Sequence, residues 1–299
     1  MLRNKKIVVI LGPTASGKTK LSIELAKLFN GEIVSADSRQ VYKKMDIGTD
    51  KISKKERKGI PHYLIDVASP KKTFTVARYK DLAVKAIKKI QKNRKIPFLV
   101  GGTGFYIQAV TDGLLVPEVK PDWKLRKELE KKSAEELFDI LKEKDPQRAK
   151  SIDRFNKRRL IRAIEIITKT KKPVSPLKKI KPDFEVLKIG IKKSQKSLKK
   201  AIKERFSRWL KQGLIKEVKD LRKAGLSWKK IEEFGIHYRQ IALYLQNKIS
   251  REEMIEKSLK ELEQYAKRQM TWFKKDKEIH WIKNKGEAKK AVKKFLEKN

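Results

Sequence analysis

The sequence has no cysteine, which excludes disulfides, thiol chemistry and cysteine-ligated zinc sites. Its three histidines, His62, His237 and His280, are scattered without the spacing of a metal site. No apolar run approaches the length that a membrane helix needs, and no signal peptide precedes the first strand-like segment. We therefore expect a cytoplasmic protein with no membrane partner.

Acidic residues are scarce relative to basic ones. The 299 residues include 78 Lys and Arg against 36 Asp and Glu, which gives a formal net charge of +42. Such an excess indicates a polyanionic partner whose phosphates attract Lys and Arg. A genome-wide lysine bias that only solvates the surface is the alternative interpretation, because net charge alone reports non-specific attraction.

Strand-like and helical patterns alternate in the first third of the chain. Apolar, β-branched runs are found at 6–11, 32–35, 63–67 and 96–100, and amphipathic helical patterns at 19–29 and 76–91. This alternation predicts an α/β fold with a parallel sheet and helices on both of its faces.

The pattern changes near Pro121, where lysine-rich helices follow one another without intervening strands. The later elements that we expect are helices at 122–144 and 156–171, a strand at 184–191, helices broken near Gly213, Gly225 and Gly235, a strand at 279–282 and a last helix to Phe295. We therefore predict a first part of the α/β core at 1–120, a helical insertion at 121–181 and a helix-rich return to the core at 182–299.

Residues 12–19 (GPTASGKT) match the phosphate-binding loop pattern, between a strand and a helix as that motif requires. Glycines let backbone amides face a phosphate, and the helix N-terminus adds a favourable dipole. The candidate phosphate-binding residues are Gly12, Pro13, Thr14, Ala15, Ser16, Gly17, Lys18 and Thr19. Lys18 would reach the distal phosphate and Thr19 would place its hydroxyl on Mg²⁺. An ordinary glycine-rich turn is the alternative, and the loop by itself does not imply nucleotide hydrolysis.

Asp37 follows the 32–35 run and would face the ligand crevice at the carboxyl edge of the sheet. An aspartate that only caps a turn is the alternative. The 96–100 run ends in Gly101-Gly102-Thr103-Gly104 and lacks the carboxylate that kinases usually provide for Mg²⁺. A small-molecule kinase stays open as an alternative, although a small acceptor does not require the long basic helical half.

Short segments across nearly the whole chain form a more specific pattern. They are, in order, GPTASGKT (12–19), ADSRQVY (36–42), MDIGT (45–49), PHYLID (61–66), GGTGFY (101–106), DPQRA (145–149), RRLIRAIE (158–165), HYRQ (237–240) and YAKRQMTWF (265–273). Together they resemble the tRNA dimethylallyltransferase family, also called tRNA isopentenyltransferase. The chain departs from that family at Tyr63, at Phe105 and at His237, which replaces a glycine.

The resemblance implies a P-loop nucleotide-kinase-like core with an inserted helical domain. It also implies transfer of a dimethylallyl group from dimethylallyl diphosphate to N6 of the tRNA adenosine 3′ to the anticodon, with release of diphosphate. Mg²⁺ is the implied cofactor, and the anticodon stem-loop of tRNA is the implied macromolecular partner. By the same resemblance Asp37 would be the general base, Lys18 would neutralise the leaving group, and Thr103 would position the amine or the diphosphate. We expect a monomer.

The segments matching the family's tRNA contacts contain a larger set of residues. They are Asp37, Ser38, Arg39, Gln40, Thr103, Arg126, Arg158, Arg159, Leu160, Ile161, Arg162, Tyr238, Arg239, Lys267, Arg268, Gln269, Trp272, Phe273 and Lys274. Core packing is the alternative for Trp272 and Phe273, and a solvated surface for Arg126. We expect Glu24, Glu165, Glu217 and Glu263 to pair with neighbouring basic side chains.

Two further functions share parts of this pattern. An adenylate isopentenyltransferase, which prenylates free AMP, ADP or ATP, has the same loop, but the basic segments at 158–162 and 265–273 favour tRNA. A non-catalytic RNA-binding protein with a relic loop is disfavoured, because Lys18, Thr19 and Asp37 are all intact.

Overall fold

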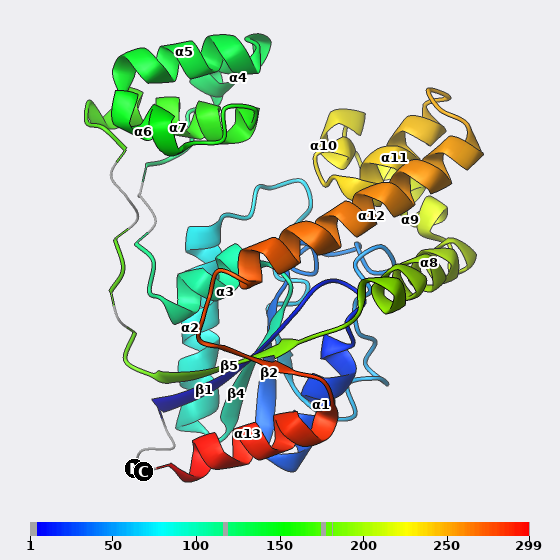
Figure 1. The fold of residues 1–299 in the computed structure, drawn as a ribbon. Coiled ribbons are helices and arrows are strands. Elements are labelled where there is room, and N and C mark those ends of the chain that lie inside the picture. The colour runs from blue at the N-terminus through cyan, green and yellow to red at the C-terminus, as the bar shows by residue number, and fades with distance from the viewer. Residues whose placement is uncertain (1–4, 116–118, 175–177, 181, 299) are drawn as a thin grey trace. The chain divides into compact units, whose positions relative to one another are not determined.

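The computed structural model describes residues 5–115, 119–174, 178–180 and 182–298 (Figure 1). Its contacts divide the chain into two compact units. One comprises Met1–Gly113 and Lys181–Asn299, and the other comprises Leu114–Ile180.

The first unit contains a parallel six-stranded sheet in the order β3-β2-β4-β1-β5-β6 (Figure 1). The strands are β1 (Lys6–Leu11), β2 (Gly31–Ala36), β3 (His62–Tyr63), β4 (Ile96–Gly101), β5 (Glu185–Ile191) and β6 (Ile279–Ile282). Gly101 of β4 is paired with both Leu11 of β1 and Ala36 of β2. The loops that follow these three strands therefore leave the sheet at neighbouring points of one edge.

Alternation along β1 explains why the sheet has two buried faces. Val8 and Ile10 pack in a cluster with α1 (Lys18–Leu28) and α13 (Lys285–Glu297). Ile7 and Val9 belong to the larger cluster of α2 (Val76–Lys92), α3 (Gly104–Thr111) and the C-terminal helices. Those helices are α8 (Gln195–Lys211), α9 (Leu214–Lys223), α10 (Trp228–Glu232), α11 (Ile236–Leu245) and α12 (Arg251–Phe273).

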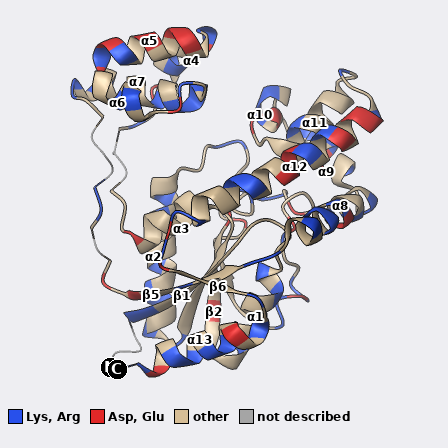
Figure 2. Cartoon of the chain, viewed as in Figure 1, with Lys and Arg blue, Asp and Glu red and all other residues tan. Residues whose placement is uncertain are grey.

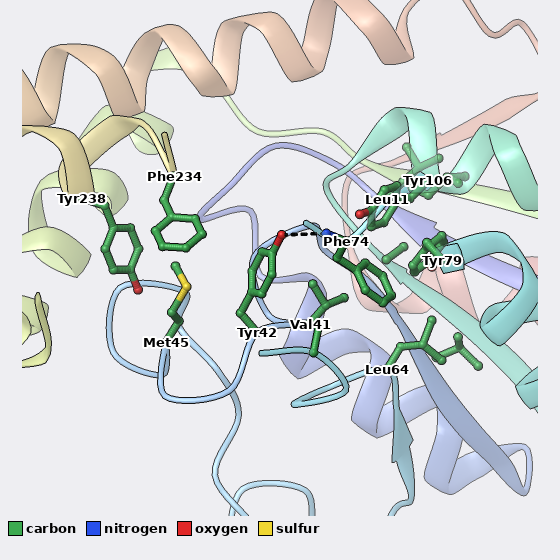
Figure 3. Packing of buried hydrophobic residues seen from close by; sticks show 14 of the residues in the cluster. Leu11, Val41, Tyr42, Met45, Leu64, Phe74, Tyr79, Tyr106, Phe234 and Tyr238 are labelled. Atoms are coloured by element: carbon green, nitrogen blue, oxygen red, sulfur yellow. Dashed lines mark hydrogen bonds between the residues drawn. The ribbon is translucent and has the colours of Figure 1, made fainter. Parts of the chain in front are cut away.

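The long loop after β2 packs against the C-terminal helices (Figure 3). The Tyr42 ring lies 5.4 Å from the Phe234 ring, and its hydroxyl accepts a hydrogen bond of 3.3 Å from the Phe74 amide. Met45 is fully buried in the same cluster as Tyr238 of α11. The segment that begins with Asp37 is thus anchored at its far end by aromatic packing.

The second unit is a small helical bundle of α4 (Trp123–Lys131), α5 (Ala134–Lys144), α6 (Pro146–Ser151) and α7 (Lys157–Thr170). Leu129, Leu137, Leu141, Leu160 and Ile164 form its core. The single helix expected at 122–144 is wrong. Ser133 and Glu136 form a capping box that starts a new helix, so the chain breaks into α4 and α5.

Most of the elements expected in the sheet are confirmed, including the strands at 6–11 and 279–282. The strand expected at 63–67 is wrong, because β3 ends at Tyr63. Leu64 and Asp66 have φ angles of 63° and 59°, and such left-handed backbone cannot continue a strand. The helices α3 and α6 were not predicted.

Glu165 organises the second unit from inside. Its side chain is fully buried; Oε1 accepts hydrogen bonds from the Asp122 amide (2.6 Å) and Arg126 Nε (2.8 Å), and Arg162 pairs with Oε2. Burial alone would raise the pKa of Glu165, but these donors lower it to about 2. The carboxylate therefore joins the start of α4 to α7.

We predict that Glu165→Gln loosens the second unit by roughly 3 kcal/mol, since it breaks a buried ion-pair network. The folded pKa lies below the unfolded one, so this stabilisation is present above about pH 4.5 and is lost as pH falls toward 2. Amide hydrogen exchange in peptides from α4 and α7 measures it. Lys131→Gln, in an exposed pair with Glu128, is the control. Equal protection in the wild type and Glu165→Gln would contradict the prediction.

Candidate active site

The loop between β1 and α1 has the backbone that phosphate binding requires. Gly12 and Gly17 have φ angles of 152° and 94°, conformations that side chains rarely adopt. The Lys18 residue is half-buried, and its Nζ donates to the Gly12 and Pro13 carbonyls at 3.0 and 2.7 Å. Burial lowers the pKa of Lys18 to about 7, and Arg205 adds to that effect, while Asp37 and Asp50 oppose it.

Arg205 of α8 lies beside this loop, and the sequence analysis missed it. Its guanidinium donates to Thr14 Oγ1 at 3.2 Å and pairs with Asp50 at 3.2 Å. Asp50 also accepts from Arg208 at 2.6 Å and from Trp209 Nε1 at 3.0 Å. A lone arginine in a lysine-rich helix gives no local signal, so only the fold identifies it as a second cation at the phosphate loop.

Asp37 lies in the loop that directly follows β2. Its Oδ1 accepts hydrogen bonds from the amides of Arg39 (2.8 Å) and Gln40 (3.3 Å), so it does cap a turn, as the alternative interpretation held. Within the described part of the chain no hydrogen bond occupies Oδ2. One oxygen thus fixes the side chain, and the other is available to accept a proton.

Thr103 joins the loop after β4 to the Asp37 loop. Its amide donates to the Ala36 carbonyl at 3.1 Å, and its Oγ1 accepts from the Ser38 amide at 3.0 Å. These bonds extend the β2–β4 pairing past the end of the sheet. The structure therefore holds Thr103 against the two residues that flank Asp37.

One face of α12 covers the loop after β4. Tyr265, Gln269 and Trp272 are four and three residues apart, which puts them on the same side of a helix. A Cβ at Gly104 would lie 2.4 Å from Trp272 Cδ1, and Gln269 Nε2 donates to the Gly102 carbonyl at 2.8 Å. Burial and the Asp37 carboxylate raise the pKa of Tyr265, and a hydrogen bond with Thr103 opposes them.

Glu217 of α9 holds the MDIGT segment at 45–49, and this role differs from the expected pairing with a basic residue. Its carboxylate accepts from the amides of Asp46 (2.6 Å), Ile47 (2.7 Å) and Gly48 (3.1 Å), and from the Tyr238 hydroxyl (2.7 Å). The expected pairing is confirmed at Glu24, Glu165 and Glu263.

The structure differs from the expectation at several proposed tRNA-contacting positions, whose side chains are buried in packing. They are Leu160, Ile161, Tyr238, Gln269 and Phe273. Apolar side chains at helical spacing pack against the core, and this explains Leu160, Ile161 and Phe273. A buried side chain does not contact tRNA directly, so neighbouring residues must make any contact there.

The remaining members of that set are accessible. Exposed side chains are those of Arg158, Arg159, Arg239, Lys267, Arg268, Trp272 and Lys274, and half-buried ones are those of Asp37, Ser38, Arg39, Gln40, Thr103, Arg126 and Arg162. The sequence analysis missed Phe155, which lies just before α7. It is 76% exposed, and the Arg154 guanidinium lies 4.9 Å from its ring.

Thr19 is the one site residue predicted to touch a metal ion. Thr19 is exposed in the first turn of α1, where the phosphate-loop motif ends. The described residues contain no group of three or more His, Asp or Glu side chains that could hold a metal ion. In those residues no helix has the length and apolarity of a membrane span.

Comparison with known proteins identifies the family. The IPP transferase family model matches residues 40–276. A tRNA dimethylallyltransferase of Acetivibrio thermocellus is 45% identical over 94% of this chain and 92% of its own length. One from Halothermothrix orenii is 43% identical over 93% of this chain and 88% of its own length.

Solved structures agree with this result. The tRNA isopentenylpyrophosphate transferase of Bacillus halodurans matches with a TM-score of 0.74 and 37% identity, over 98% of this chain and 97% of its own. A eukaryotic dimethylallyltransferase acting on tRNA matches with a TM-score of 0.78 and 29% identity, over 93% of this chain and 74% of its own. With the phosphate loop, Asp37 and Thr103 brought together at one edge of a parallel sheet, this chain belongs to the IPP transferase family.

Proposed function

We propose that this protein transfers a dimethylallyl group from dimethylallyl diphosphate to N6 of the tRNA adenosine 3′ to the anticodon, with release of diphosphate. One observation carries the proposal: hydrogen bonds join the loop of Thr103 to the loop of Asp37, beside the phosphate loop. A diphosphate cradle and a candidate base then lie at one edge of the sheet. Relatives that are 45% and 43% identical to this chain are named tRNA dimethylallyltransferase.

The donor half of the reaction needs neutralisation of the leaving diphosphate. Lys18 and Arg205 supply two positive charges at the loop, and the loop amides supply further hydrogen-bond donors. The exposed Thr19 would offer Mg²⁺ a hydroxyl oxygen, a ligand of the kind that this ion prefers. Mg²⁺, when bound, would offset the charge that develops on the diphosphate.

The acceptor half needs removal of a proton from a weakly nucleophilic amine. The bond from N6 to the allylic carbon forms as the bond from that carbon to the diphosphate oxygen breaks. Asp37, held through Oδ1, accepts the amine proton on Oδ2, and Thr103 keeps the Asp37 loop in place. The diphosphate leaves with the bonding electron pair.

The first test is transfer of labelled dimethylallyl diphosphate, with Mg²⁺, to unmodified tRNA, to AMP and to ATP. We expect label in tRNA only, and none when the adenosine 3′ to the anticodon is replaced.

Asp37→Asn keeps the turn because its side-chain oxygen still accepts from Arg39 and Gln40. We expect it to lower turnover by about 10²–10⁴-fold with tRNA affinity within about threefold of the wild type.

The other outcomes separate the alternatives. Label in AMP or ATP alone would make the protein an adenylate isopentenyltransferase. No label from a folded protein that turns over ATP would favour the small-molecule kinase. Full activity of Asp37→Asn would remove Asp37 from the chemistry and leave it as a turn residue.

Lys18 makes diphosphate binding depend on pH. In the free protein its pKa is about 7, and a bound diphosphate would raise that pKa because it favours the charged amine. Binding above pH 7 should therefore take up a proton, and affinity for pyrophosphate should fall about tenfold between pH 6.5 and 8.5. Calorimetry in buffers of different ionisation enthalpy measures both quantities.

The matched control is Lys18→Arg, which stays charged over this range. Titration of pyrophosphate itself affects both proteins equally, so the difference between them isolates Lys18. Identical pH dependence and identical proton uptake in the two proteins would contradict the assignment.

The second unit carries a candidate surface for tRNA. Arg158 and Arg159 are exposed at the start of α7, close in sequence to the exposed Phe155, whereas Arg162 is partly committed to Glu165. Exposed cations beside an aromatic ring suit the phosphates and unstacked bases of an RNA loop. We extend the proposal to a cytoplasmic, monomeric enzyme that binds the anticodon stem-loop through this unit.

We expect Arg158→Gln with Arg159→Gln to weaken tRNA binding and to reduce its salt dependence by up to about two slope units, about one for each lost phosphate contact. Filter binding over a salt series measures the slope. Lys289→Gln with Lys290→Gln removes two exposed charges from α13, outside every segment assigned to tRNA, and should change the slope less. Equal slopes for the wild type and the arginine variant would exclude phosphate contacts by both residues.

A further inference from the structure

The Gln269 side chain is buried, and both ends of its amide are bonded to the backbone of the active site. Its Oε1 accepts a hydrogen bond of 2.8 Å from the Thr14 amide, and its Nε2 donates one of 2.8 Å to the Gly102 carbonyl. Only 6% of the residue is exposed. Thr14 lies in the phosphate loop, and Gly102 lies in the loop after β4, so one side chain spans two loops.

A continuous set of bonds runs from this side chain to the candidate base. Gly102 precedes Thr103, whose amide donates to the Ala36 carbonyl and whose hydroxyl accepts from the Ser38 amide. Ala36 and Ser38 flank Asp37 in the chain. Gln269 therefore joins the phosphate loop to the segment that holds Asp37.

The chemistry of this position calls for an amide. One end of the side chain must accept a hydrogen bond from Thr14, while the other must donate one to Gly102. A carboxylate could make only the first, and an apolar side chain of similar length neither. The contact is also close, because a Cβ at Gly102 would lie 2.3 Å from Gln269 Nε2.

Diphosphate binding has support that does not pass through Gln269. Gly17 and the start of α1 follow directly from the loop, and Lys18 is held by the Gly12 and Pro13 carbonyls. Loss of Gln269 would leave this cradle but release its spacing from Asp37. Misplacement of reacting groups by about 1 Å can lower a rate by about 10²-fold.

We propose that Gln269 is a positioning residue that fixes the distance between the donor cradle and the Asp37 loop, so that α12 sets the alignment of the two substrates. The inference rests on the proposed function. It replaces the expectation that Gln269 contacts tRNA, because both ends of its amide are already engaged within the protein. Exposed neighbours on the same helix, Lys267 and Arg268, remain available for tRNA.

The test compares Gln269→Met, which keeps the length of the side chain, and Gln269→Glu, which keeps only the acceptor. Gln264→Met is the matched control, because Gln264 is exposed on the same helix. Calorimetry with pyrophosphate gives the affinity and the number of competent sites. Single-turnover transfer to tRNA gives the rate per competent site, and filter binding gives tRNA affinity.

We expect both Gln269 variants to transfer about 10- to 100-fold more slowly per pyrophosphate-binding site. Pyrophosphate affinity should stay within about threefold of the wild type, tRNA affinity within about twofold, and Gln264→Met should behave as the wild type. A rate per site within about twofold of the wild type for Gln269→Met would overturn the proposal. So would a loss confined to tRNA affinity, or one explained wholly by fewer competent sites.

Failure of the proposed function looks different. A wild-type protein that transfers nothing to tRNA overturns both ideas together. An active wild type with an unimpaired Gln269→Met variant overturns the positioning role alone.

Discussion

The pairing of β4 with both β1 and β2 is the constraint on which the site depends. Gly101 is opposite Leu11 on one side and opposite Ala36 on the other, so three loops leave the sheet together. A Cβ at Gly101 would lie 2.1 Å from the Ala36 carbonyl oxygen, which only glycine avoids. Thr103 then continues the pairing beyond the strands through its bonds to Ala36 and Ser38. The phosphate loop, Asp37 and Thr103 each follow one of these three strands, so the pairing of the strands determines where they lie.

Positively and negatively charged side chains lie close together at this edge of the sheet. Lys18 and Arg205 lie beside the phosphate loop, and Asp37 and Asp50 influence the pKa of Lys18 in the opposite sense. Asp50 also pairs with Arg205 and Arg208. An anionic ligand would therefore enter a site whose cations are already held in place, Lys18 by the Gly12 and Pro13 carbonyls and Arg205 by Asp50. Such preorganisation avoids reorganisation of the side chains when charge develops on a leaving group.

Local patterns were enough to predict the phosphate loop, the position of Asp37 and the strands of the sheet other than β3. β-branched runs, the spacing of GPTASGKT and an aspartate at a strand end are all properties of short segments. The partners of Gln269, Arg205 and Glu217 were not predictable in this way. Gln269 and Arg205 lie 255 and 191 residues from their common partner Thr14. Glu217 lies 171 residues from its partner Asp46. The spacing of Tyr265, Gln269 and Trp272 does indicate one helical face, but only the fold reveals that this face covers the glycine turn.

The same limit applies to the charge of +42, which indicates a polyanion without locating it. Lys and Arg are spread over α8 and α13 as well as over the second unit (Figure 2), and α13 packs beneath the sheet without any residue of the candidate site. Part of the lysine content therefore lies on helices outside the segments assigned to the candidate site and to tRNA. Acidic residues are what distinguish particular cations. The buried Glu165 holds Arg126 and Arg162, and Asp50 holds Arg205 and Arg208. A cation held in one geometry loses less conformational freedom on binding a phosphate than a lysine on an exposed helix does. Arg205, held by Asp50, is therefore suited to bind an anion fixed at the phosphate loop, whereas the exposed Arg158 and Arg159 would lose conformational freedom on binding tRNA phosphates.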